Sequence, residues 1–137
     1  MTKFEEVYDV FLSQINDPVL MENDEDDELK YRYLLNSIPR FRKCKQDLSD
    51  RDESQFNVEL TDEEILILGT LMVCEYLSPM IVSLQSLQQF LNSKDFELSS
   101  QANHLRSLMA MQKSKKQEVD KLIVDYTYNN GSLSELR

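Results

Sequence analysis

Residues 60–84 read LTDEEILILGTLMVCEYLSPMIVSL. Thr61 and Glu64 have the spacing of a capping box, in which each side chain accepts a hydrogen bond from the other residue's backbone N–H. Leu60 and Ile65 occupy the two positions of a hydrophobic staple around that cap. The residues that follow are apolar on nearly every helical face, which is typical of a helix surrounded by protein. This stretch therefore predicts a central buried helix, around which the rest of the chain packs.

Two prolines interrupt the helical patterns. Ser78 followed by Pro79 resembles an N-cap with proline at the first helical position. We therefore expect a break or sharp kink there, with one helix over about 62–77 and another over about 79–91. Pro39 lies within a second helical pattern, over about 29–41. Either Ser37 caps a restart, or Pro39 kinks a continuous helix.

The N-terminal residues predict another helix, over about 3–15. Apolar residues recur there at spacings of three and four. Thr2 and Glu5 have capping-box spacing at its start, and Asp17-Pro18 ends it. A helix near by would also explain Gly69, which costs the interior of the central helix about 1 kcal/mol relative to alanine. Gly69 either marks the close approach of another helix or is incidental.

A long helix is predicted from Leu98 or Ser100 to Tyr126. About 27 residues would span roughly 40 Å, so we expect part of it to project or to pack on another copy. Its seam has a polar centre, which argues against an uninterrupted coiled coil. The seam comprises Ala102, Leu105, Met109, Gln112, Lys116, Val119, Ile123 and Tyr126.

The fold class that these patterns predict is all-α. The chain has 137 residues with 2 glycines and 3 prolines, which favours long helices and few turns. We expect a bundle of about five helices in a single domain over 1–126, followed by an extended C-terminal tail over 127–137. The alternation of Phe56 and Val58 with polar residues is compatible with a short strand, paired with 45–48 as a minor β-hairpin around 45–60.

The formal net charge of −10 argues against general nucleic-acid binding and favours a partner with a basic face. The charge is uneven. Residues 22–28 carry six anions, whereas residues 30–45 carry six cations and no anion. With their aromatic residues, the cations resemble a single-strand-binding surface, but the more ordinary interpretation is a solvated face. For residues 22–28, a solvated acidic segment or a docking strip for a basic partner is favoured over a calcium-binding loop.

No catalytic, cofactor or metal site is predicted. His104 is the only histidine, so the usual zinc triad cannot be built. A pair of His104 with Cys44 or Cys74 has no local support, and the two cysteines do not form a disulfide framework. The acidic run lacks the glycine of an EF-hand loop. No signal segment or membrane span is predicted, since Glu75 and Pro79 break the longest apolar stretch.

The order of elements resembles the head–tail connector (neck or adaptor) proteins of tailed bacteriophages. The resemblance rests on LLNSIPRF at 34–41, a loop with Asp47 and Phe56, LTDEEILIL at 60–68, and VDYTYNNGSL at 124–133. It covers most of the chain as a pattern of helices. This chain is longer than the small adaptors, and its last helix is more extended.

The resemblance implies a structural virion protein in the neck, made in the host cytoplasm and without catalytic residues. It implies self-association into a ring, commonly twelvefold, that contacts the portal and other neck or tail proteins. DNA would pass through the lumen without sequence-specific binding, and an acidic lumen would let it slide. The tail would reach a neighbouring copy or the portal. The partner-interface residues implied are Tyr126, Tyr128, Leu133 and Leu136.

Other functions fit the same residues. The charge of −10 suits a small acidic cytoplasmic protein that masks a basic surface of a partner, acting as a monomer or dimer with salt-sensitive binding. A helical nucleic-acid regulator that uses residues 30–45 would show DNA affinity at moderate salt. Enzymatic functions have the least support. The tail separates the first two functions, because a ring subunit needs apolar residues to bury on its neighbours.

Overall fold

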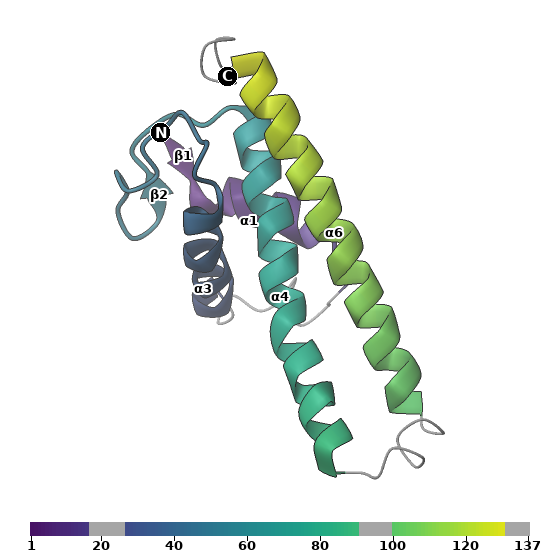
Figure 1. Cartoon of the computed structure of the whole chain (residues 1–137). Coiled ribbons are helices and arrows are strands. Elements are labelled where there is room, and N and C mark those ends of the chain that lie inside the picture. Colours follow the sequence, from purple (N-terminus) through teal and green to yellow (C-terminus); the bar gives the residue numbers. More distant parts are fainter. Residues whose placement is uncertain (17–26, 91–99, 131–137) are drawn as a thin grey trace.

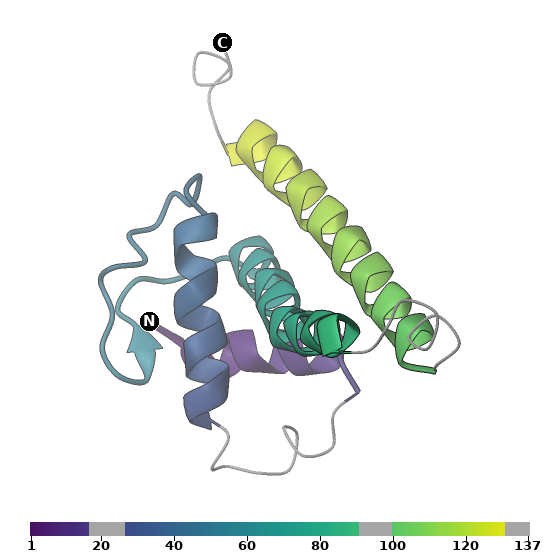
Figure 2. The same cartoon turned by 60° about the horizontal axis from the view of Figure 1, so that its bottom comes forward.

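The chain is an all-α protein with one small two-stranded sheet, as predicted. A computed structural model describes residues 1–16, 27–90 and 100–130. Two long helices, α4 and α6, lie side by side, and two short helices, α1 and α3, pack against α4 (Figures 1 and 2). The elements in chain order are β1 (Thr2–Lys3), α1 (Phe4–Ser13), α3 (Asp27–Ser37), the 3-10 helix η2 (Ile38–Arg40), β2 (Gln55–Phe56), α4 (Asp62–Phe90) and α6 (Ser100–Asn130).

The N-terminal half of α4 is the centre of the core. Its capping box forms as predicted: the Thr61 N–H donates to the Glu64 carboxyl group, and the Glu64 N–H donates to the Thr61 hydroxyl. Leu60 and Ile65, the two staple residues, are both buried. From residue 67 to residue 74, every residue of α4 is buried. The prediction of a central buried helix is confirmed.

Gly69 marks the crossing of α1 over α4. A Cβ atom built on Gly69 would lie 2.6 Å from Cγ1 of Val10, 2.9 Å from its Cβ and 3.2 Å from the backbone nitrogen of Phe11. Any side chain larger than hydrogen would therefore push α1 away from α4. The glycine is required by packing, which decides between the two interpretations left open by the sequence.

Of the two outcomes predicted at Pro79, a break or a sharp kink, the break is wrong, because α4 continues as one helix to Phe90. The Ser78 hydroxyl is not an N-cap and instead donates to the Cys74 carbonyl, one turn back. The Gln112 amide of α6 donates to the same carbonyl and to the Ser78 hydroxyl. The polar centre of the α6 seam thus lies against the helical turn before the proline and supplies hydrogen bonds there.

The outer halves of α4 and α6 form a two-helix arm, made of Ser78–Phe90 and Ser100–Gln117. The outer part of the arm extends past the ends of α1 and α3 (Figure 1). Ala102, Leu105 and Leu108 are its buried apolar residues on α6, whereas Met109, predicted to lie in the seam, is 47% exposed. The seam therefore includes Leu108 in place of Met109. The arm agrees with the prediction that part of the long helix projects.

The minor β-hairpin around 45–60 is only partly correct. A strand does form at Gln55–Phe56, but it pairs antiparallel with Thr2–Lys3 and not with residues 45–48. Thr2 is therefore not the N-cap of α1. Its hydroxyl accepts a hydrogen bond from the Leu60 N–H, 2.8 Å away, which ties the N-terminus to the residues before α4.

The helix before Pro39 ends at Ser37 and is followed by a single 3-10 turn. Ser37 caps no restart, because its hydroxyl donates to the Tyr33 carbonyl within α3. At the other end of the chain, α6 continues to Asn130, so the first residues of the predicted tail are helical. Residues 131–137, and residues 22–26 of the acidic run, lie outside the described residues.

α4 is long and apolar enough to cross a membrane, judged by length and composition alone. However, 56% of its most apolar window is buried inside the protein, as in the core helix of a soluble domain. This burial is accounted for by α1, α3 and α6, which pack along α4.

Candidate functional site

Tyr126 anchors the C-terminal part of α6 to the start of α4. Its side chain is 1% exposed, and its hydroxyl donates to the Glu64 carboxyl group over 2.7 Å. The same hydroxyl accepts a hydrogen bond from the Lys45 N–H over 2.8 Å. The Cys44 thiol donates to the same Glu64 oxygen over 3.4 Å. Tyr126 is therefore a core residue and leaves no surface for a partner, contrary to the interface role implied by the resemblance.

In the cluster of Glu64, Tyr126 and Cys44, the tyrosine hydroxyl and the cysteine thiol keep their protons and donate hydrogen bonds to the Glu64 carboxyl group. The pKa of the Cys44 thiol is raised to about 12, mainly by burial and also by the adjacent Glu64 carboxyl group. Burial, followed by the hydrogen bond to Glu64, also raises the pKa of Tyr126. A thiol with so high a pKa is a weak nucleophile at neutral pH. The cluster therefore has a structural role: it holds the C-terminal part of α6 against the start of α4.

Tyr128 is placed differently from Tyr126. It is 65% exposed, and Val124, one turn earlier on α6, is 64% exposed. Residues four apart lie on one helical face, so Val124 and Tyr128 form an exposed apolar pair. Leu133 and Leu136, the other two predicted interface residues, lie outside the described residues.

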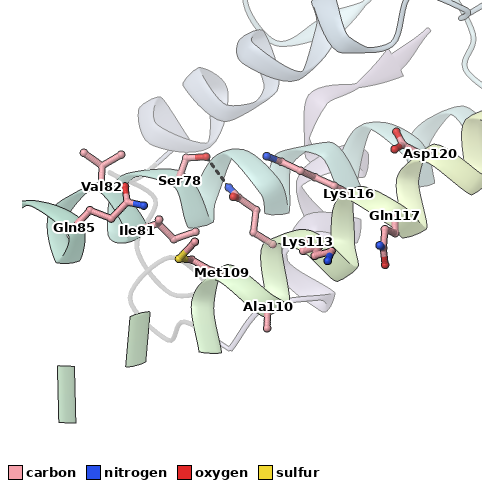
Figure 3. A pocket seen from close by; sticks show the side chains of 11 residues that line it. Ser78, Ile81, Val82, Gln85, Met109, Ala110, Lys113, Lys116, Gln117 and Asp120 are labelled. Carbon is pink, nitrogen blue, oxygen red and sulfur yellow. Dashed lines mark hydrogen bonds between the residues drawn. The ribbon is translucent and has the colours of Figure 1, made fainter. Parts of the chain in front are cut away.

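The arm carries a groove between its two helices. Figure 3 shows this groove, which has a volume of about 640 Å³. Its apolar part is lined by Ile81, Val82 and Met109, and Lys113 and Lys116 line it towards the core. Neither lysine makes a hydrogen bond or an ion pair with another residue in the described part of the chain.

The sign of the charge on the arm is opposite to that of the protein. The arm carries four cations, Arg106, Lys113, Lys115 and Lys116, and no anion. At the other end of the molecule, residues 45–63 carry seven anions and two cations. We call residues 45–63 the acidic loop; it begins a few residues after η2, includes β2 and ends in the first turn of α4 (Figure 1).

The predicted basic face over residues 30–45 is divided by the fold. Lys30 is buried, with its Nζ atom 5.9 Å from the centre of the Tyr8 ring. Arg40 is paired with Glu75 of α4, 2.6 Å away. Arg42 and Lys43 are exposed. Tyr33 and Phe41 are core residues and are not available for stacking on bases.

The residues considered for catalysis lie in different parts of the fold. His104 is exposed near the outer end of the arm, beside Pro79 and Met80. Cys74 is buried in the middle of α4, and Cys44 is in the Glu64 cluster. Both cysteines are free thiols. Among the described residues, no group of three His, Cys, Asp or Glu side chains is placed to hold a metal ion.

The sequence alone did not reveal the arm groove or the contact between Glu64 and Tyr126. One signal for the groove was available, since no charged residue occurs from Tyr76 to Phe90 although apolar residues continue. The pairing of Glu64 with Tyr126 had no comparable signal, because the two residues are 62 positions apart.

Fold and surfaces together define a small helical protein with a projecting two-helix arm. The chain belongs to the family described as YomZ prophage protein, which matches residues 1–128. It is therefore a phage-derived protein. No curated protein and no solved structure matches the chain.

Proposed function

We propose that this protein is a head–tail connector subunit of a tailed bacteriophage. In this proposal, copies form a ring between the portal and the tail, DNA passes through the lumen, and the protein acts structurally in the neck of the virion. The prophage family supports the phage context. The observation that carries the proposal is the two-helix arm, because it presents apolar surface that the protomer itself does not cover.

The exposed apolar side chains of the arm are large. Val82 is 59% exposed, Phe90 87%, Met109 47% and Met111 49%. Single exposed apolar residues are common, but four of them gathered on one projecting element favour a protein-contact surface. A ring subunit has such a surface, which is buried when neighbouring copies assemble.

The C-terminal end of α6 supplies a second contact in the proposed ring. Tyr126 fixes this end of the helix to Glu64, so the helix presents Val124 and Tyr128 in a defined orientation. We propose that Tyr128, with Leu133 and Leu136 of the following residues, contacts a neighbouring copy or the portal. Tyr126 has a positioning role in this contact and does not touch the partner.

Removal of residues 131–137 tests the C-terminal contact without disturbing the Tyr126 anchor. The truncated protein is expected to keep the helical circular dichroism and the melting temperature of the full chain, but to lose assembly. Tyr128→Ala in the full chain is a milder version of the same test. If the truncated protein assembles as the full chain does, the C-terminal contact is refuted.

A genetic experiment tests the function itself. Induction of the prophage with an in-frame deletion of the gene is expected to yield heads and tails that accumulate separately. Supply of the intact gene in trans is the control and is expected to restore joined particles. A normal yield of joined, infectious particles without the gene would refute the connector function and would favour the acidic partner-masking protein.

A further inference from the structure

We propose that the arm groove binds the acidic loop of a second copy of this chain, so that the copies associate head to tail. This inference deepens the proposed function and rests on it, since it names the surfaces that join neighbours in the ring. The interface is heterologous, meaning that two different surfaces of the protein meet. Repetition of such a contact gives a closed ring when the rotation closes and a filament when it does not.

Charge complementarity identifies the occupant of the groove. The arm holds four cations and no anion, in a chain whose net charge is −10. The acidic loop holds seven anions and two cations. Opposite potentials on two surfaces of one chain attract a second copy in one orientation and repel arm from arm and loop from loop. A symmetric dimer through two arms would bring like charges together.

The cations of the groove are available for such a contact. Lys113 and Lys116 have no hydrogen-bond or ion-pair partner among the described residues, whereas Lys115 is engaged by Glu118 and Gln14. Figure 3 shows both free lysines beside the groove, next to Gln117 and Asp120. Among the described residues, Asp120 is the one anion that lines the groove, and it lies outside the arm.

The acidic loop is ordered by its own hydrogen bonds. Asp47 accepts hydrogen bonds from Ser49, and Asp52 accepts from Ser54 and Gln55. Asn57 donates to Asp50 and so links two parts of the loop. An ordered loop loses less conformational entropy on binding than a flexible one. The carboxylates therefore present a preformed anionic surface to the lysines of a neighbouring arm.

The apolar side chains beside the lysines add area to the contact. Val82 and Met109 line the groove and are exposed in the protomer. The combination of cations with apolar side chains also occurs on surfaces that bind nucleic acid. A second copy is favoured here because the acidic chain as a whole repels a polyanion, while its acidic loop attracts the arm.

Charge reversal on each surface, followed by mixing, tests the head-to-tail contact. The arm variant is Lys113→Glu with Lys116→Glu. The loop variant is Glu53→Lys with Asp62→Lys, chosen because neither side chain makes a hydrogen bond in the described parts of the chain. At the substituted positions, each variant alone brings like charges together, because two glutamates on the arm then face the acidic loop, or two lysines on the loop then face the arm lysines. In an equal mixture, the wild-type arm of the loop variant meets the wild-type loop of the arm variant, and the substituted glutamates meet the substituted lysines.

Sedimentation velocity measures the association of the copies at two ionic strengths. Charges interact over long distances at about 0.01 M and are strongly screened at about 1 M. We expect the wild-type chain to associate at low salt, each variant to associate at least about tenfold more weakly, and the mixture to recover association. Arg42→Glu with Lys43→Glu is the matched control, since it makes the same change in net charge outside the arm. It should associate at least as strongly as the wild type, because it adds anions beside the acidic loop. Circular dichroism verifies folding of every variant.

Three results would overturn the inference. They are a wild-type chain that stays monomeric at low salt, a mixture that does not recover association, and an arm that binds duplex DNA without self-association. If rings form with the portal while the mixture fails, the connector function stands and only the proposed contact is lost. If the mixture recovers association but prophages lacking the gene make normal particles, the contact stands and the connector function is lost.

Discussion

Replacement of Tyr126 by phenylalanine should lower the free energy of unfolding strongly, although it removes only a single oxygen atom. The Tyr126 hydroxyl donates to the buried Glu64 carboxyl group and accepts from the Lys45 N–H. Three donors meet at that carboxyl group, from Thr61, Cys44 and Tyr126, which suits an acceptor-only carboxylate at a helix N-terminus.

The magnitude follows from these two hydrogen bonds. A hydrogen bond to a charged group contributes about 1.5–3 kcal/mol, and a donor left without its acceptor costs about 1 kcal/mol more. The phenylalanine ring fills the same space beside Phe41, so no cavity term is added. We expect the free energy of unfolding to fall by about 3 kcal/mol and the melting temperature to fall by roughly 10 °C.

Urea denaturation followed by circular dichroism measures this change. Tyr128→Phe is the matched control, since that tyrosine is exposed on the same helix, and it should change stability by less than about 0.5 kcal/mol. Equal effects of the two substitutions would refute the positioning role of Tyr126. Loss of assembly in Tyr126→Phe under conditions where the variant is folded would show that the orientation of the helix end matters for partner contacts.

Three further predictions concern the packing of the helices. Gly69→Ala should destabilise the protein by about 1–2 kcal/mol in thermal melts, because the clash with Val10 exceeds the gain in helix propensity, and equal or higher stability would contradict the close crossing. Gln112→Ala should cost about 1–2 kcal/mol by removing two hydrogen bonds to α4, whereas Gln117→Ala on the exposed face should be nearly neutral. Stability should fall as the pH rises from about 9 to about 12, because the unfolded Cys44 thiol releases its proton near 9.0 and the folded one near 12, and Cys44→Ala should reduce that fall.

The elements that could be predicted from the sequence are those whose signals are local. The capping box at Thr61, the staple around it and the three-and-four spacing of apolar residues each lie within a few positions, and the helices they predict are present. A close helix approach at Gly69 was one of the two interpretations that the sequence allowed, and the sequence did not indicate which helix approaches it.

The elements that could not be predicted depend on contacts between distant residues. Ser78-Pro79 reads locally as a new helix start, but α6 packs along α4 through this point, and Gln112 supplies hydrogen bonds before the proline. The strand at residues 55–56 pairs with residues 2–3, more than 50 positions away, and not with residues 45–48. Tyr126 was assigned to an interface because nothing near it in sequence indicates that Glu64 binds its hydroxyl.

The most direct test of the connector function is negative-stain electron microscopy of the purified protein, alone and mixed with the portal protein of the same phage. The expected result is closed rings of one symmetry in at least one sample, and their loss with Lys113→Glu and Lys116→Glu if the arm joins the copies. Small particles alone in both samples would contradict the connector function and favour the acidic partner-masking protein.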